Sequence, residues 1–396
     1  MTKKLRNILK NGVSYFMKIM IFLPNHTLAI ERGDTTHIKE LVSNLSKFAE
    51  IDLIKADDKA ITENVSLTVK ALRIVKGLAR GSLSILRKRP DLVYTRSSQD
   101  IFTFLLAKLF RLPFIIEING LSADELKIAI GISWIRRWIS YAKGLLNERT
   151  YKYADHLVAV TPKIKEVLEI EYKINPEKIS VIENGANTEL FRPMNTHEVR
   201  KELNLNQDNS YICFVGNLAE WQGIQYLIKA SSHILEEYPN TFFLIVGDGP
   251  SRESLTKLAV QYGVSDNFIF TGMVPYEKIP LYINSSDLCV GPWVKERNQR
   301  CGVSPLKLYE YLACGKPVVV SRLPGLEIVE EYDCGYFVEP DNEHELAQMI
   351  IKLLKDAAAR RQIGENGRRY IVEKNRNWES VAKRVFEVCQ MLIKKH

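Results

Sequence analysis

The sequence contains no C-x-x-C pair, although six cysteines are spread along its 396 residues. Zinc sites need closely spaced cysteines and disulfide frameworks need a paired set, so neither is expected. Scattered thiols are typical of a protein in a reducing compartment. We therefore expect a cytoplasmic protein without disulfide bonds.

A membrane-spanning run is also missing, because no apolar stretch reaches the roughly 20 residues that a transmembrane helix needs. The nearest stretch, IFTFLLAKLFRLPFII, is interrupted by Lys108 and Arg111. The amino terminus has basic residues ahead of an apolar stretch, but no small-residue cleavage site precedes Pro24. We interpret residues 1–16 as a basic leader, with Met17 as an alternative natural start.

Two cofactor signatures are absent as well. Dehydrogenases that bind NAD carry G-x-G-x-x-G after their first strand, whereas the turn after KIMIFLP holds Gly33 alone. The metal-binding Asp-x-Asp of many sugar-transferring enzymes occurs nowhere in the chain. These absences disfavour hydride transfer and favour chemistry without a metal or another cofactor.

The sequence does contain a regular series of short β-branched runs, spaced as in alternating strands and helices. One series extends from KIMIFLP to ISVIENG and a second from YICFVGNL to GYFVEP. A chain of this length is expected to form two domains. We therefore predict an α/β protein with two doubly wound, Rossmann-like domains. The boundary is expected near ENGANTELFRPMNTHE. The first domain would comprise residues 17–192, the second residues 193–374, and a last helix residues 375–396. One apolar stripe of that helix is formed by Trp378, Val381, Val385, Val388 and Leu392.

Positive charge is concentrated in the first half of the chain. The net charge is +8, and residues 1–190 hold 30 Lys and Arg against 21 Asp and Glu. Residues 64–90 carry seven of these cations and no acid, interleaved with apolar residues at helical spacing, and GISWIRRWISYAKGLL adds two tryptophans. Such segments suit an anionic membrane surface, although solvated charges around core tryptophans would give the same pattern. No nucleic-acid-binding motif accompanies the charge, so nucleic acid is not expected as a partner.

A lysine stands where the start of a helix disfavours a cation. In GVSPLKLYEYLACGKPVV, Ser304 is a natural N-cap and Pro305 a natural first helical residue, while Gly315 ends the helix before a strand. Lys307 then falls in the first turn, where the helix dipole opposes it unless an anion binds there. Free backbone amides, the dipole and the ammonium together suit a diphosphate, and Glu310 lies one turn further along the same face. An exposed lysine on an ordinary helix is the alternative.

Two further loops are compatible with phosphate. FVGNLAEWQGIQYLI holds Gly216 at the end of a strand, and IVGDGPSRESL holds Gly247 and Asp248 before a helix. Tight turns explain such glycines at least as often as a ligand does. Because the carboxyl ends of parallel strands share one edge of a sheet, three such loops together indicate a nucleotide site at that edge.

These segments resemble the nucleotide-sugar-binding domain of retaining GT-B glycosyltransferases of family 4. The resemblance covers most of the chain and rests on FVGNLAEWQGIQYLIKA, FLIVGDGP, FIFTGMVPYEKIPLYINSSDLCVGP and LKLYEYLACGKPVVVS, which follow the family's order and spacing. SVIENGANTELFRP resembles its interdomain link, and the helix from Trp378 resembles its last helix, which crosses back onto the first domain. The resemblance implies a GT-B fold in which two domains face a central cleft.

The resemblance also implies an activity. It implies transfer of a sugar from a UDP- or GDP-linked donor, with retention of configuration, to a glycan or lipid-linked saccharide during surface polysaccharide or oligosaccharide synthesis. Lys307 would stabilise the diphosphate and Glu310 would hold the donor ribose. The implied donor-binding residues are Gly33, Gly216, Asn217, Gln222, Gly247, Asp248, Val274, Gly302, Val303, Ser304, Leu306, Lys307 and Glu310. Arg96 and Asn119 are expected on the acceptor side.

The chain departs from the family pattern at three places. The first of the family's two glutamates falls on Gly302, and Asn217 and Gln222 stand where the family commonly has Arg and Lys. We expect Lys307 to make up the lost charge. The His-Asp that often follows the fourth strand is replaced by Asn119 and Gly120. His37 is interpreted as a helix-surface residue.

Two other functions stay open beside the transferase. One is a nucleotide-sugar epimerase of the same architecture, and the other is a catalytically silent scaffold that binds a nucleotide sugar. The basic segments of the first half favour a transferase, because an epimerase needs no acceptor surface.

Overall fold

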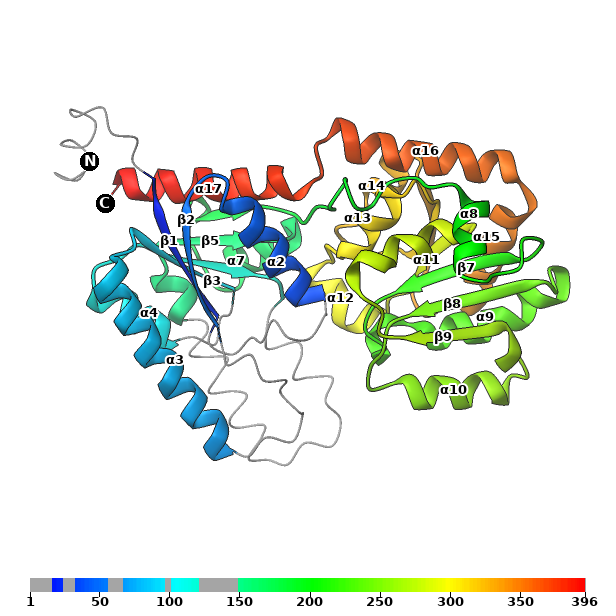
Figure 1. The fold of residues 1–396 in the computed structure, drawn as a ribbon, viewed down its shortest axis with the longest axis horizontal. Helices are drawn as coiled ribbons and strands as arrows, with labels where there is room; N and C mark the ends of the chain where they lie inside the picture. Colours follow the sequence, from blue (N-terminus) through cyan, green and yellow to red (C-terminus); the bar gives the residue numbers. More distant parts are fainter. Residues whose placement is uncertain (1–15, 24–32, 56–66, 97–100, 121–148, 396) are drawn as a thin grey trace. The chain divides into compact units, whose positions relative to one another are not determined.

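The computed structural model describes residues 16–23, 33–55, 67–96, 101–120 and 149–395 (Figure 1). Most of the predicted leader and the segment with Trp134 and Trp138 lie outside these residues. Contacts divide the chain into two compact units. The first comprises Met1–Ile30, His37–Glu183 and Glu379–His396, and the second comprises Glu31–Thr36 and Asn184–Trp378. The predicted domain limits at residues 192 and 374 stay predictions.

The first unit contains a six-stranded parallel sheet in the order β2-β1-β3-β4-β5-β6. Its strands are β1 (Lys18–Leu23), β2 (Glu50–Lys55), β3 (Leu92–Thr95), β4 (Phe114–Ile118), β5 (His156–Ala159) and β6 (Ile179–Val181). β1 and β4 are buried along almost their whole length. Near-continuous apolar strands are expected when helices cover both faces of a parallel sheet.

The described helices of this unit are α2 (Gly33–Leu45), α3 (Leu67–Lys88), α4 (Ile101–Leu109), α7 (Pro162–Ile170) and α17 (Trp378–Lys395). The predicted stripe of α17 is confirmed, because Trp378, Val381, Val385 and Leu392 are buried and Val388 is partly buried. Its Phe386 ring stacks on Phe48, with ring centroids 5.7 Å apart. None of the described helices is both long enough and apolar enough to cross a membrane.

The second unit contains a parallel sheet in the order β12-β11-β10-β7-β8-β9. Its strands are β7 (Ser210–Val215), β8 (Thr241–Val246), β9 (Phe268–Gly272), β10 (Leu288–Gly291), β11 (Val318–Ser321) and β12 (Gly335–Val338). The order reverses between β7 and β10, which pair directly. Open α/β sheets bind ligands outside the carboxyl ends of the strands at such a reversal.

Alternate residues of the second sheet enter two separate cores. Ile212 and Leu288 belong to one core, with α9 (Ile224–Glu237) and α15 (Glu343–Lys355). Their neighbours Cys213 and Cys289 belong to the other, with α13 (Leu306–Ala313) and α16 (Ala357–Glu373). Successive strand residues point to opposite faces, so one strand feeds both cores. The remaining described helices are α8 (Thr196–Glu202), α10 (Arg252–Gln261), α11 (Ile279–Ser285), α12 (Lys295–Cys301) and α14 (Ile328–Glu331). The predicted fold class, with two parallel α/β sheets, is confirmed.

Candidate functional site

The amino terminus of α13 begins one residue later than predicted. The N-cap is Pro305 and has no side-chain cap hydrogen bond, so the prediction of Ser304 as the N-cap is wrong. The Ser304 hydroxyl instead accepts a hydrogen bond from the backbone N–H of Asn184 at 3.2 Å, and the Ser304 carbonyl accepts one from the Asn184 side chain at 2.6 Å. The first amides of α13, those of Leu306 and Lys307, therefore have no side-chain cap. Uncapped amides at a helix amino terminus are suited to an anion.

Lys307 lies at the strand reversal of the second sheet. Its Nζ donates a hydrogen bond to Oε1 of Gln222, in the loop after β7, at 2.9 Å. The same Nζ lies 3.9 Å from the ring centroid of Phe214, on β7, and 5.9 Å from that of Trp293, in the loop after β10. Burial lowers the pKa of Lys307 to about 7, against the opposing effects of Glu310 and Cys213. Among the described residues, no carboxylate forms an ion pair with this ammonium.

Gly216 is the point of closest approach between the β7 loop and Lys307. Its φ is +141°, and a Cβ added there would lie 2.5 Å from Lys307 Nζ. Gly247, at the end of β8, has φ +131°, and a Cβ there would lie 2.1 Å from the carbonyl oxygen of Gly216. The positive φ favours glycine at both positions, and at Gly247 the backbone of Gly216 also leaves no room for a side chain. This packing brings the two predicted loops together.

Asn217 and Asp248 join these loops to each other. The Leu218 N–H donates to the Asp248 carbonyl at 3.0 Å, and the Asn217 side chain lies against Gly249. The Asp248 carboxylate forms an ion pair with Arg252 at 3.0 Å. Asp248 is therefore already engaged with a cation on α10.

Glu310 is buried in the middle of α13, and 5% of its surface is exposed. Its Oε1 accepts a hydrogen bond from the Tyr276 hydroxyl at 3.2 Å. Tyr276 follows β9 in the same loop as Val274, which is partly buried against the core. The structure thus brings Glu310 and the β9 loop together, through a tyrosine that the sequence analysis missed.

Gly302 has a backbone conformation that only glycine adopts readily. It ends α12 with φ +65° and ψ 179°. The next residue, Val303, donates its N–H to the carbonyl of Pro324 at 2.8 Å, and a Cβ on Gly325 would lie 2.3 Å from the Val303 carbonyl oxygen. A side chain at residue 302 would be strained, which gives a physical reason for the absence of the family's first glutamate.

A second buried cluster lies at the carboxyl ends of β3 and β4 in the first unit. Glu117 forms ion pairs with His37 at 2.9 Å and with Arg96 at 3.1 Å, and it accepts hydrogen bonds from Tyr94 and Asn119. Burial alone would raise the pKa of Glu117, but His37, Arg96 and Tyr94 outweigh it and hold this pKa well below its usual range. Burial, followed by the charge of Glu117, raises the pKa of Tyr94.

The position of His37 corrects a prediction. His37 is 2% exposed and pairs with Glu117, so its interpretation as a helix-surface residue is wrong. The face of α2 that carries His37 points toward the sheet, as the burial of Ile38 and Leu41 shows. The predicted acceptor-side residues do lie together, because Arg96 donates to Asn119 Oδ1 at 3.1 Å. Gly33 is the first residue of α2 and has open space around its α-carbon.

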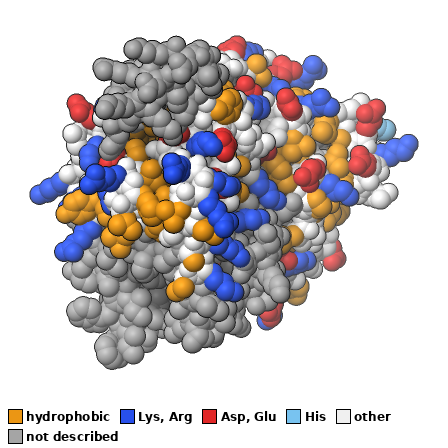
Figure 2. Space-filling view, turned by 60° about the vertical axis from the view of Figure 1, so that its left-hand side comes forward, with side chains coloured by type: hydrophobic (Ala, Val, Ile, Leu, Met, Phe, Trp, Pro, Cys, Tyr) orange, Lys and Arg blue, Asp and Glu red, His pale blue; other side chains and the backbone are white. Residues whose placement is uncertain are grey.

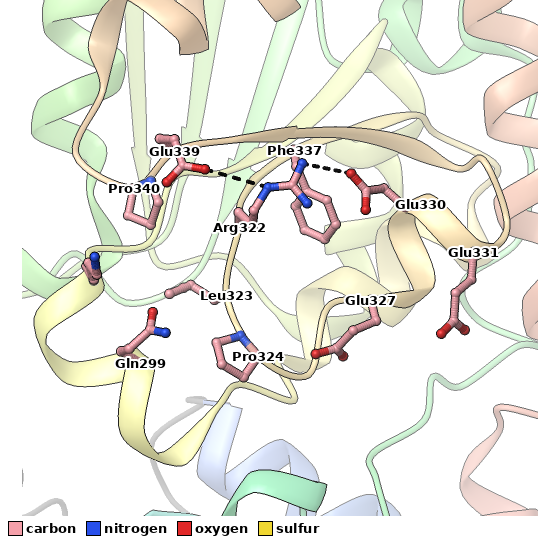
Figure 3. A pocket seen from close by; sticks show the side chains of 11 residues that line it. Gln299, Arg322, Leu323, Pro324, Glu327, Glu330, Glu331, Phe337, Glu339 and Pro340 are labelled. Carbon is pink, nitrogen blue, oxygen red and sulfur yellow. Dashed lines mark hydrogen bonds and ion pairs between the residues drawn. The ribbon is translucent and has the colours of Figure 1, made fainter.

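A pocket of about 530 Å³ lies at the carboxyl ends of β11 and β12 and contains none of the predicted site residues (Figure 3). Arg322 stacks on Phe337, with its guanidinium carbon 4.6 Å from the ring centroid. It also pairs with Glu330 at 2.7 Å and with Glu339 at 3.6 Å. The charge of Arg322 is therefore compensated within the pocket, unlike that of Lys307.

Each half of the chain matches the model of a known protein family. Residues 35–190 match the Glycosyltransferase Family 4 model, and residues 195–386 match the Glycosyl transferases group 1 model. The chain therefore carries both domains of a glycosyltransferase of the GT-B type, as the resemblance implied.

Individual relatives agree with this class. The chain is 27% identical over 310 residues to an uncharacterized glycosyltransferase, MJ1069, of Methanocaldococcus jannaschii, covering 76% of each chain. Sucrose-phosphate synthase of Thermosynechococcus elongatus has the same fold, with a TM-score of 0.79, 20% identity, and coverage of 96% of this chain and 100% of that one. Anabaena HepE, solved in complex with UDP-glucose, superposes with a TM-score of 0.72 at 17% identity, covering 95% and 100%. These likenesses at low identity establish the GT-B fold.

Proposed function

We propose that this glycosyltransferase takes its sugar from a UDP- or GDP-linked donor that binds at the amino terminus of α13. The observation that carries the proposal is Lys307, an ammonium at the strand reversal that faces a neutral amide and two aromatic rings. The uncapped amides of Leu306 and Lys307 add two donors beside it. HepE, which shares the fold, binds UDP-glucose.

The chemistry at this site follows from the leaving group. When the bond between the anomeric carbon and the nucleoside diphosphate breaks, negative charge grows on the β-phosphate. Lys307 and the α13 amides would stabilise this charge, which is how preorganised donors accelerate such a step. Glu310, which accepts a hydrogen bond from Tyr276, would also accept hydrogen bonds from the donor ribose. Transfer with retention would follow if the acceptor attacks the face that the leaving group departs from.

We propose that no metal ion takes part. The support is that Lys307 and the helix amides already provide positive charge for the diphosphate, the role that a metal ion fills in Asp-x-Asp enzymes. Addition of EDTA to the purified enzyme is expected to leave donor turnover unchanged.

We also propose that the acceptor is a glycan or lipid-linked saccharide presented at the cytoplasmic face of an anionic membrane. The support is the surface of α3 and α4, two helices in contact with each other. Exposed apolar and basic residues lie together there: Val75, Lys76, Leu83, Leu86, Arg87, Leu105 and Leu109. Figure 2 shows blue and orange side chains interspersed on this side of the first unit, with few red ones. Apolar area and cations together suit an anionic lipid surface better than nucleic acid.

The test is a panel of UDP- and GDP-sugars assayed with native membrane lipid and monitored for release of nucleoside diphosphate. A transferase releases diphosphate only when an acceptor is present and moves the sugar onto lipid or glycan. An epimerase changes the donor sugar without an acceptor. A scaffold binds nucleotide and releases nothing, and either of these two results would overturn the proposal.

A further inference from the structure

Tyr276 joins the loop after β9 to the middle of α13. Its hydroxyl donates a hydrogen bond to Glu310 Oε1 at 3.2 Å. The strand before it ends at Gly272, whose carbonyl accepts a hydrogen bond from the Gly247 N–H at 3.0 Å. Gly247 belongs to one of the two loops that the sequence indicates as compatible with phosphate. The tyrosine is therefore held on the same framework of loops as the candidate diphosphate site.

Packing fixes the ring of Tyr276. The ring is partly buried against one core of the second unit, and its centroid lies 5.3 Å from that of Phe191. Phe191 is fully buried, and its carbonyl accepts a hydrogen bond from Arg368 on α16 at 3.3 Å. A tyrosine side chain has only two torsions, so contacts that fix its ring also fix the position of its hydroxyl. The hydroxyl that contacts Glu310 is thus positioned by residues outside α13.

The Glu310 carboxylate needs such a contact to be oriented. Glu310 is 5% exposed and follows Lys307 by three residues in α13, so the two side chains share one face of the helix. The last torsion of a glutamate side chain has only broad intrinsic preferences, so the chain itself barely restricts rotation of the carboxylate plane. A carboxylate has about four acceptor sites, and Tyr276 uses one of them. The hydrogen bond from Tyr276 therefore selects one orientation of the carboxylate.

We propose that Tyr276 is a positioning residue that holds the Glu310 carboxylate in the orientation that accepts hydrogen bonds from the donor ribose, and so sets a preference for ribonucleotides over 2′-deoxyribonucleotides. The inference rests on the proposed donor site. A hydrogen bond from a hydroxyl to a carboxylate is charge-assisted and therefore strong. A site built to accept a substrate hydroxyl rejects the analogue that lacks it, because the buried acceptor is then left unpaired.

The experiment is isothermal titration calorimetry of the full chain with UDP and with 2′-deoxy-UDP, or with GDP and 2′-deoxy-GDP if only GDP binds. We expect the wild type to bind the ribonucleotide at least about tenfold more tightly, the usual effect of one hydrogen bond to a charged group. Tyr276→Phe keeps the ring beside Phe191 but removes the hydroxyl. It should reduce the preference to about threefold or less, chiefly by weakening binding of the ribonucleotide. Glu310→Gln should reduce the preference in the same way, because the acceptor loses its charge.

The matched control is Tyr332→Phe, which removes the hydroxyl of another tyrosine that is partly buried against the same core. It should bind both nucleotides as the wild type does. If Tyr276 only supported the fold, Tyr276→Phe would change both affinities equally and keep the preference of the wild type. That result, or a wild type that binds both nucleotides equally, would overturn the inference and leave the donor site standing. If neither UDP nor GDP binds the wild type, the proposed function falls and this inference falls with it.

Discussion

Each unit contains a cluster around one charged side chain, and the clusters differ in whether the protein supplies the opposite charge. In the first unit, the Glu117 carboxylate is compensated by His37 and Arg96. In the second unit, Lys307 has only the neutral Gln222 as a hydrogen-bond acceptor among the described residues. Removing one partner of a buried ion pair is strongly destabilising, because the other charge is left without compensation. The comparison therefore sets a carboxylate whose loss should affect stability beside a lysine whose loss should affect the proposed donor binding.

The largest expected effect comes from removing the uncompensated charge. Lys307→Ala should slow donor turnover by about 10² to 10³, the usual cost of losing one donor to a developing anion. Its urea unfolding midpoint should change little, because no ion pair is broken. Diphosphate release from the donor that the panel identifies measures the rate, with Lys257→Ala as control. An unchanged rate would remove Lys307 from the site.

Removing the compensated carboxylate should act on stability instead. Glu117→Gln leaves Arg96 and His37 without their carboxylate and should lower the free energy of unfolding at pH 7 by about 3 kcal/mol. Glu379→Gln, which breaks the exposed pair with Lys47, should cost less than about 1 kcal/mol. Urea unfolding of both variants measures the difference.

The same variant has a pH signature. Because the pKa of Glu117 is held below its usual range, its contribution is present above pH about 4.3, the unfolded value, and is lost as the pH falls. The stability gap between wild type and Glu117→Gln should therefore shrink from pH 7 to pH 3. A gap that stays constant over this range would contradict the role of the charge.

A smaller effect is expected at Gly302, where the backbone rather than a charge is at issue. Gly302→Glu restores the family's first glutamate in sequence, but the conformation with φ +65° and ψ 179° strains any side chain. We expect a loss of about 1 to 3 kcal/mol in stability and no gain in donor turnover. A faster enzyme of unchanged stability would show that the backbone conformation at residue 302 does not exclude a glutamate.

The smallest expected effect concerns the surface of the first unit. Arg87→Gln on α3 should weaken binding to anionic vesicles by about fivefold, since one cation near such a surface contributes about 1 kcal/mol. Lys257→Gln in the second unit is the matched control and should bind as the wild type does. Vesicle sedimentation with and without anionic lipid measures both. Equal weakening by the two variants would mean that the first unit has no special membrane surface.

Much of this architecture could be predicted because it depends on local patterns. The apolar runs of the strands predict both parallel sheets, and the Gly315 turn, with φ +70°, ends α13 before β11 as expected. Likewise, the stripe of α17 follows from a repeat of about 3.6 residues.

The errors and omissions depend on contacts between distant residues. His37 pairs with Glu117 on a distant strand. The Ser304 hydroxyl accepts a hydrogen bond from Asn184, 120 residues away, and therefore does not cap α13. Gln222 accepts hydrogen bonds from both Trp293 and Lys307, which brings the loops after β7 and β10 together with α13. The periodic pattern of apolar residues in the sequence does not predict contacts between residues so far apart. Trp293, the last residue of LCVGPW, was the one feature of the sequence that could have pointed to the contacts around Gln222.

The most direct test of the central claim is a crystal structure of the protein with UDP, or with GDP if only that nucleotide binds. We predict a diphosphate oxygen at hydrogen-bond distance, about 2.7 to 3.2 Å, from Lys307 Nζ and from the first amides of α13. Gln222 should no longer accept from Lys307 in that complex. A nucleotide bound with its diphosphate away from α13, while Lys307 still donates to Gln222, would contradict the account.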